Sequence, residues 1–211
     1  MSKVKIALLS LVLAAPFASA ASFNCAKAAT AVEKMVCADP DLSREDDHLN
    51  GSYKRAVERV GNKLAMREWQ RTWLRSPALT GCKTTACVKE AYGMRVKLLD
   101  DAVKSPWNGH YVRHYKGKPD RNTAEIVLIE SVEGGVSGEG NTMWLGPSAA
   151  NGQVHEGSFS AMGERHGMGL MFHSEMCRLT MTLKGAVLKV EDVNNYCGGA
   201  NANFNGDYRR K

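Results

Sequence analysis

The chain has 211 residues, of which 44% are hydrophobic and 24% are charged. These are ordinary globular values, and they exclude a disordered or fibrous protein. The only long apolar stretch, residues 6–17, is shorter than the ~20 residues that a membrane span requires. A polytopic membrane protein is therefore excluded as well.

The N-terminus has the pattern of a secretory signal peptide. Lys3 and Lys5 precede the apolar stretch, which runs into the small residues Ala18-Ser19-Ala20. We therefore expect residues 1–20 to be removed, leaving a periplasmic or secreted bacterial protein that begins at Ala21. The 28 basic residues then fall to 26 against 22 acidic ones, a mildly basic net charge of +4.

All six cysteines lie beyond the predicted cleavage point, and an even number in an oxidising compartment predicts three disulfides. Cys25 and Cys37 flank a short predicted helix, and Cys82 and Cys87 flank a turn, so two local pairs are geometrically reasonable. The rival connectivity ties the Cys25/Cys37 segment to the Cys82/Cys87 turn. Cys177 and Cys197 remain for a third bond.

Residues 21–104 carry the start signals, stop signals and apolar periodicity that are typical of a helical domain. Thr30 with Glu33, and Ser43 with Asp46, resemble capping arrangements that each start a helix. Three apolar stripes follow with a period close to 3.6 residues, one ending near Gly61, one stopping at Pro77 and one running over 88–103. The pattern predicts three main helices and a short leading one, packed as a small bundle.

Residues 105–211 change to short β-rich runs separated by glycine and asparagine clusters. The predicted strands cover residues 124–132, 153–161, 169–173, 177–183 and 186–193. The fold class is therefore α+β: a disulfide-braced helical bundle followed by a small antiparallel β sandwich or barrel. Residues 134–140 are rich in glycine and are interpreted as a mobile loop or a long hairpin connection.

A weak internal repeat stands at the two ends of this β-rich half. Residues 107–113 and 204–210 both fit the pattern aromatic-Asn-Gly-x-Tyr-x-Arg. This pattern suits an edge strand. It combines an aromatic residue, a glycine that admits close backbone approach and a tyrosine two residues after that glycine. The repeat predicts that these two segments meet and close the sandwich or barrel.

An ordered set of residues in the helical half resembles a known family. The set comprises Phe23-Asn24-Cys25-Ala26-Lys27-Ala28, Val32-Glu33-Lys34, Cys37, Asp39-Pro40-Asp41-Leu42, Gln70-Arg71-Thr72-Trp73-Leu74, Cys82 and Cys87. Together they resemble the LprI-like lysozyme-inhibitor N-terminal domain over residues 23–103. Glu45 and Ser76-Pro77 depart from that pattern. The resemblance implies an exported, disulfide-braced helical domain, sometimes associated with inhibition of lysozyme.

The sequence favours binding over catalysis. It contains none of the nucleophile-elbow, zinc-protease or phosphate-loop motifs that would indicate an enzyme, and no cofactor is expected. Its basic residues suit the polar faces of helices, so no nucleic-acid partner is expected. The partner proposed is a lysozyme or another peptidoglycan hydrolase. Since lysozymes are usually basic, the candidate contact residues are acidic: Glu133 and Glu139, which a protruding glycine-rich loop would present, and Asp41 and Asp47.

Methionines gather in the β-rich half near two histidines, which raises an alternative. Met168, Met171, His173 and Met176 carry the thioether and imidazole groups that Cu(I) prefers. The competing interpretation is that Met168, Leu170 and Phe172 share one face of a strand and fill the core. A copper-binding protein and an envelope-structural or interaction module are therefore the alternatives to an inhibitor.

Overall fold

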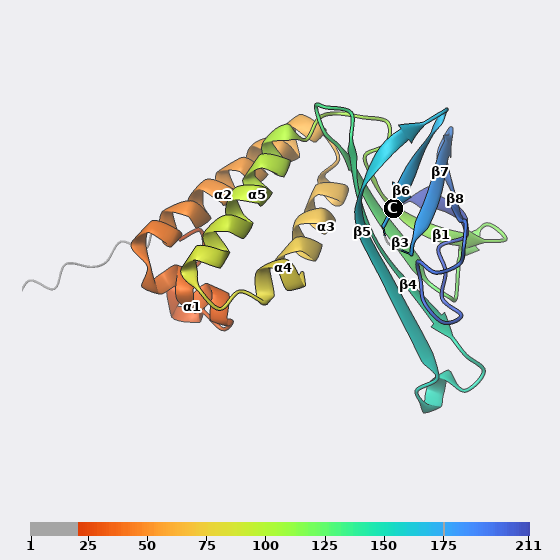
Figure 1. Cartoon of the computed structure of the whole chain (residues 1–211), viewed down its shortest axis with the longest axis horizontal. Helices are drawn as coiled ribbons and strands as arrows, with labels where there is room; N and C mark the ends of the chain where they lie inside the picture. Colours follow the sequence, from red (N-terminus) through yellow and green to blue (C-terminus); the bar gives the residue numbers. More distant parts are fainter. Residues whose placement is uncertain (1–20, 175) are drawn as a thin grey trace, which may run out of the picture.

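The computed structural model describes residues 21–174 and 176–211, so the predicted signal peptide lies outside the described residues. A group of helices comes first in the chain and packs against the outside of a β-barrel formed by the second half (Figure 1). Within the described residues, no helix combines the length and the apolar character needed to cross a membrane.

The helical part contains the expected short leading helix and three main helices, with two short additions. The elements are η1 (Cys25–Lys27), α1 (Ala31–Ala38), α2 (Pro40–Val60), α3 (Lys63–Leu74), α4 (Pro77–Thr80) and α5 (Thr85–Asp101). Helix α2 ends at Gly61, whose φ of 71° is in the left-handed region that glycine enters without a steric cost. Pro77 ends the predicted second stripe, but it also opens α4, because proline suits the first turn of a helix.

One of the two predicted helix starts is correct. Thr30 and Glu33 form a complete capping box at α1, with both reciprocal hydrogen bonds present. The start predicted at Ser43 was wrong, because Asp39 caps α2 and Pro40 opens it. Ser43 instead lies inside α2 and donates a hydrogen bond to the carbonyl of Val36, which ties α2 to α1.

Three disulfides join cysteines that are close in the chain. Cys25 bonds to Cys37, Cys82 to Cys87 and Cys177 to Cys197, and no described cysteine is free. The local connectivity is therefore confirmed over the rival one. Three disulfides are typical of proteins that fold in an oxidising compartment.

The β-rich half is a closed antiparallel barrel, which decides between the sandwich and the barrel. Eight strands form the closed sheet in the order β1-β3-β4-β5-β6-β7-β8-β9, with β1 also paired to β9, and the short β2 extends β1 at one end. The strands are β1 (Gly109–Tyr115), β2 (Lys118–Pro119), β3 (Ala124–Glu130), β4 (Val136–Leu145), β5 (Val154–His166), β6 (Gly169–His173), β7 (Arg178–Lys184), β8 (Val187–Asp192) and β9 (Gly206–Arg210), with η2 (Ala149–Asn151) between β4 and β5.

The glycine-rich segment predicted as a loop is mostly strand β4. Gly138 and Gly140 point into the barrel, where a Cβ atom would lie 2.4 Å from ring carbons of Phe172 and Phe159, respectively. Glycine is required here because these large rings fill the interior of a small barrel. The turn that remains is short, residues 131–135, between β3 and β4.

The internal repeat closes the barrel, as the sequence predicts. Strands β1 and β9 pair antiparallel, with Tyr111 opposite Arg210 and Arg113 opposite Tyr208. Both tyrosines are fully buried, and each donates its hydroxyl to the carbonyl of the aromatic residue four positions earlier, at 2.9 Å. This is the geometry of a tyrosine corner, formed twice.

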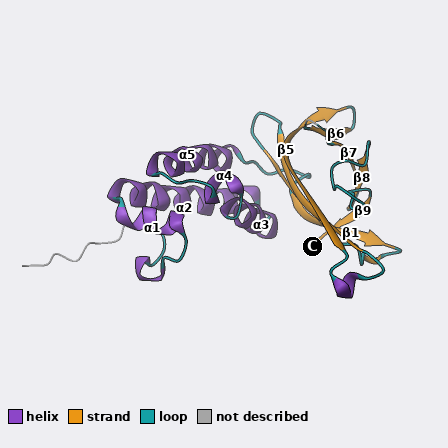
Figure 2. Cartoon of the chain, turned by 60° about the horizontal axis from the view of Figure 1, so that its bottom comes forward, coloured by secondary structure: helices purple, strands orange, loops and turns teal. Residues whose placement is uncertain are grey.

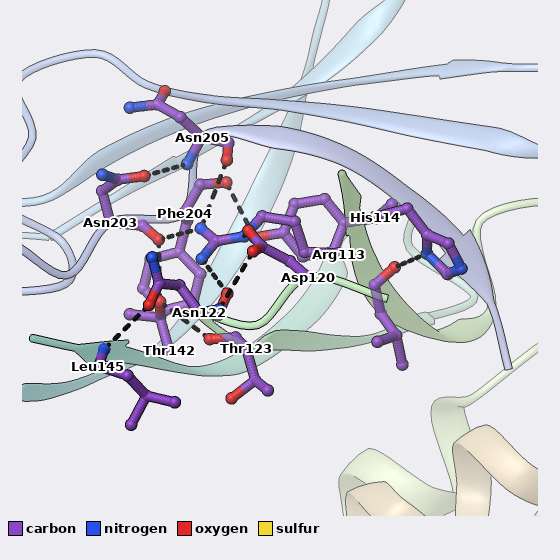
Figure 3. Close-up of polar contacts among 12 residues, drawn as sticks. Arg113, His114, Asp120, Asn122, Thr123, Thr142, Leu145, Asn203, Phe204 and Asn205 are labelled. Atoms are coloured by element: carbon purple, nitrogen blue, oxygen red, sulfur yellow. Dashed lines mark hydrogen bonds and ion pairs between the residues drawn. The ribbon is translucent and has the colours of Figure 1, made fainter. Parts of the chain in front are cut away.

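The arginine of each repeat binds the carbonyl of the residue that immediately precedes the other repeat. Arg210 donates to the carbonyl of Pro106 and to the hydroxyl of Tyr111. Arg113 donates to the carbonyl of Asn203 at 2.7 Å and to that of Asn122, and its Nε lies 2.9 Å from a carboxylate oxygen of Asp120 (Figure 3). Pro106 and Asn203 are equivalent, since each directly precedes the aromatic residue of its repeat. Two reciprocal sets of contacts therefore hold the seam, which we define as the pairing of β1 with β9.

The helices and the barrel share one hydrophobic core. Val127 and Ile129 of β3 point outward from the barrel and are buried among the helical residues, together with Trp69 of α3 and Leu99 of α5. The indole nitrogen of Trp69 also donates to the hydroxyl of Ser137 on β4, at 3.1 Å. Helix α3 therefore packs against the outer face of the barrel at β1 and β3, and Figure 2 shows the helices on one side of the sheet.

The tyrosine corners give a test of the seam. Tyr208→Phe removes one buried hydroxyl and leaves the carbonyl of Phe204 without its partner, so the free energy of unfolding should fall by about 1–2 kcal/mol. Urea denaturation followed by circular dichroism measures the change. Tyr196→Phe, at an exposed position, is the control and should change stability little. Equal stability of the two variants would show that the corner does not hold the seam.

Candidate functional site

A cleft of about 700 Å³ lies where the helices meet the barrel. Its floor is the outer face of β4 and β5, where Ser137, Glu139 and Asn141 alternate with the inward-facing glycines of β4. Ser160 and Ser158 stand opposite Glu139 and Asn141 on β5. Helices α3 and α4 form the walls, so the cleft forms only when the helices pack against the barrel.

Arg95 of α5 is the most unusual side chain of the cleft, since it is only 1% exposed. Its guanidinium carbon lies 3.7 Å from the ring centroid of Trp69 and 5.4 Å from that of Trp73, which are cation–π distances. Its Nε donates to Gln70 at 2.9 Å, whereas its Nη2 is buried and has no hydrogen-bond partner among the described residues. Burial lowers the pKa of Arg95 to about 10, so the group remains cationic at neutral pH.

Glu139 is the acid of the same cleft. Burial raises its pKa from the ordinary 4.5 to about 7, and the charge of Arg95 and the indole N–H of Trp69 oppose that rise only in part. The negative charge of Glu68 raises it further. The buried Oε2 of Glu139 has no hydrogen-bond partner within the described chain. Glu139 is therefore a carboxyl group that titrates near neutrality.

The rim of the cleft is more polar and more positively charged. Glu68 and Arg71 form an ion pair on α3, and the exposed Arg75 follows at the end of that helix. Trp73 and Pro77 supply apolar surface beside them. The cleft thus combines a desolvated cation, a titratable acid, hydroxyl groups and apolar wall, which is the composition of a site that binds a small polar molecule.

The structure separates the four acids that the sequence suggested as partner contacts. Glu139 faces the helices from β4 and so is not displayed on a protruding loop; that part of the interpretation was wrong. Glu133 is exposed in the turn between β3 and β4, whose neighbouring Val132 bonds to Asp101 at the end of α5. Asp41 and Asp47 lie near the start of α2.

Asp41 and Glu133 are at opposite ends of the helical part. Lys89, near the start of α5, lies 4.0 Å from Asp41, whereas Glu133 follows strand β3 near the end of α5. Helix α5 has 17 residues, which corresponds to a length of ~25 Å. One small contact therefore cannot use both groups of acids.

The structure does not bring the suggested copper ligands together. Met168 precedes β6 and Met176 follows it, so these residues lie at opposite ends of a strand ~17 Å long. Met168 is 92% exposed, so the expectation that it fills the core with Leu170 and Phe172 was wrong for Met168 and right for the other two. Across residues 21–174 and 176–211, no group of three or more His, Cys, Asp or Glu side chains could hold a metal ion.

Arg95 was not identified from the sequence, although a signal was present. The apolar stripe of the third predicted helix passes through Val88, Tyr92 and Leu99, and Arg95 falls on the same face at helical spacing. An arginine inside an apolar stripe indicates a buried charge. Such a charge requires a partner or a ligand.

No family model matches the chain, and neither the curated proteins nor the solved structures contain a match.

The raised pKa of Glu139 predicts a measurable pH dependence of stability. The folded state binds the proton more tightly than the unfolded state, so stability due to this group is present below about pH 4.5 and is lost as the pH rises through about 7. Glu139→Gln, which is always neutral, should raise the free energy of unfolding by about 1–3 kcal/mol at pH 8 and change it little at pH 5.

Urea denaturation of both proteins between pH 5 and pH 8 measures this difference. Glu133→Gln removes an exposed acid on the same hairpin and is the matched control, for which no such pH-dependent difference is expected. A constant difference between Glu139→Gln and the wild type across this pH range would contradict the assignment.

Proposed function

We propose that the protein is an exported binding protein that inhibits a lysozyme or a related cell-wall hydrolase. The resemblance of residues 23–103 to the LprI-like family supports this function, as do the signal-peptide pattern and the three disulfides. Periplasmic or extracellular location is part of the same proposal.

The observation that carries the proposal is a rigid acidic corner at the start of α2. We define this acidic corner as Asp41 and Glu45, about one turn apart on one side of α2, together with Asp47, which projects from another side; all three are exposed. The carboxylate of Asp39 accepts the N–H groups of residues 41 and 42, and Pro40 fixes the first turn, so the backbone beneath the corner is well determined.

Covalent and polar contacts hold the corner against the rest of the helical part. The Cys25–Cys37 disulfide braces η1 to α1, immediately before α2. Asp46, between the exposed acids, is buried and accepts hydrogen bonds from the Tyr92 hydroxyl at 2.9 Å and from the backbone N–H of Ser22 at 2.8 Å. Asp46 is therefore a structural residue, which leaves its exposed neighbours free to meet a partner.

A basic hydrolase would be attracted to this corner locally, although the mature chain has a net positive charge. Arg44 and Lys89 neutralise part of the charge of Asp41, since both approach its carboxylate. Glu45 and Asp47 supply the remaining negative charge. Local acidic surfaces increase the rate of association with cationic partners, and salt weakens the effect.

Inhibition can be tested with a panel of lysozymes and a charge-neutralised variant. Asp41→Asn with Asp47→Asn should lower the association rate several-fold at low salt and flatten its dependence on salt concentration. The matched control is Glu191→Gln with Asp207→Asn, which makes the same change in net charge on exposed barrel strands. This control should bind like the wild type.

The outcomes separate the candidate functions. Unchanged inhibition by the corner variant, with loss of inhibition on Glu133→Gln, would move the contact to the other end of the helical part. Absence of inhibition of every lysozyme would overturn the proposal and favour an envelope-structural or interaction module. Stoichiometric copper binding would instead favour a metal-handling protein.

A further inference from the structure

The cleft between the helices and the barrel contains two buried polar atoms without partners, and these atoms have opposite character. Arg95 Nη2 is a donor on a cation, and Glu139 Oε2 is an acceptor on an acid. Leaving a buried polar group unpaired costs free energy, and more so for a charged group. Both side chains line one cleft, so a single ligand there can reach both groups when they turn toward it.

No hydrogen bond joins Arg95 and Glu139 among the described residues. Arg95 and Glu139 attract each other, yet neither Nη2 nor Oε2 has a hydrogen-bond partner in the described part of the chain. Gln70 binds the Nε of Arg95 and Trp69 covers the guanidinium face, so the orientation of the cation is set without Glu139. The Arg95 group is therefore held in place for an additional acceptor.

We propose that this cleft binds a small zwitterion carrying an α-amino acid group, with its carboxylate at Arg95 and its ammonium at Glu139. Each end of such a ligand meets a group of opposite charge in a partly desolvated site, where charge-assisted hydrogen bonds are strongest. A ligand with only a carboxylate would leave Glu139 unpaired. A ligand with only an amine would leave Arg95 unpaired.

The rest of the cleft is suited to an apolar side chain on that ligand. Trp73, Pro77 and Met162 contribute apolar surface from the wall and the floor. Arg71 is paired with Glu68, so Arg75 at the rim supplies the unpaired positive charge on the side of α3, which favours entry of a carboxylate. Leucine and phenylalanine are accordingly the first free amino acids to test.

The charges around Glu139 set the sign of the pH dependence. Arg95 on α5 lowers the pKa of Glu139, Glu68 on α3 raises it, and burial, the largest effect, keeps it near 7. Arg71 is paired with Glu68. The ammonium and carboxylate of an amino acid both stay charged between pH 5 and pH 8, so affinity should decrease as the pH falls and Glu139 is protonated.

Calorimetric titration of the purified protein at pH 8 tests the inference directly. The probes are leucine, phenylalanine and two forms of leucine with one charge blocked or removed: N-acetyl-leucine, which lacks the ammonium, and 3-methylbutylamine, which lacks the carboxylate and stays protonated at pH 8; glucose is the uncharged control. We expect the free amino acids to bind and each blocked form to bind at least ~10-fold more weakly, because one charge-assisted contact is lost.

Glu139→Gln provides the second arm, since a neutral residue at this position is expected to preserve the fold. It should weaken leucine binding at least ~10-fold and leave N-acetyl-leucine binding unchanged, because only the ammonium contact is removed. Glu133→Gln, on the exposed turn, should bind leucine like the wild type. Leucine affinity should also fall between pH 8 and pH 5 in the wild type but not in Glu139→Gln.

Several results would overturn the inference. Equal affinity for leucine and N-acetyl-leucine would remove the role of Glu139. Absence of binding by both amino acids, or binding of glucose alone, would show that the cleft holds water or a hydroxylated ligand instead. The test is independent of the proposed inhibition, because the acidic corner at the start of α2 forms no part of this cleft.

Discussion

The seam between β1 and β9 is the contact on which the rest of the structure depends, because it converts a sheet into a closed barrel. Two copies of one short motif meet there. Tyr111 and Tyr208 each bond within their own copy, while Arg113 and Arg210 each bind the carbonyl that immediately precedes the other copy. Closure removes the free edges that β1 and β9 would otherwise present. Strands β4 and β5 of the same barrel form the floor of the cleft.

The helices depend on the barrel as much as they brace it. Val127 and Ile129 carry apolar surface outward from β3, and the helical residues around Trp69 cover it. Arg95 is buried beside this core, against Trp69 and Gln70 of α3. The unusual electrostatics of Glu139 and Arg95 thus arise at the junction between the two parts, and the rigid acidic corner of α2 lies away from it.

Local interactions explain most of what could be predicted. The capping box of Thr30 and Glu33 and the disulfide pairs involve residues close in the chain. All five predicted strands are present. The wrongly predicted helix start at Ser43 also has a specific physical reason. Ser43 and Asp46 imitate a helix cap, but their side chains serve contacts with Val36 and Tyr92 that helix packing creates.

The sequence by itself determined the α+β class, the helical periods, the local disulfides and the repeat that closes the barrel, because short-range geometry governs these features. Only the tertiary structure decided that residues 136–145 form β4, since Gly138 and Gly140 are needed by the rings of Phe172 and Phe159 from distant strands. The tertiary structure also created the cleft between the helices and the barrel. Arg95 and Glu139 are 44 positions apart, and folding alone brings them to one desolvated cleft where their charges interact.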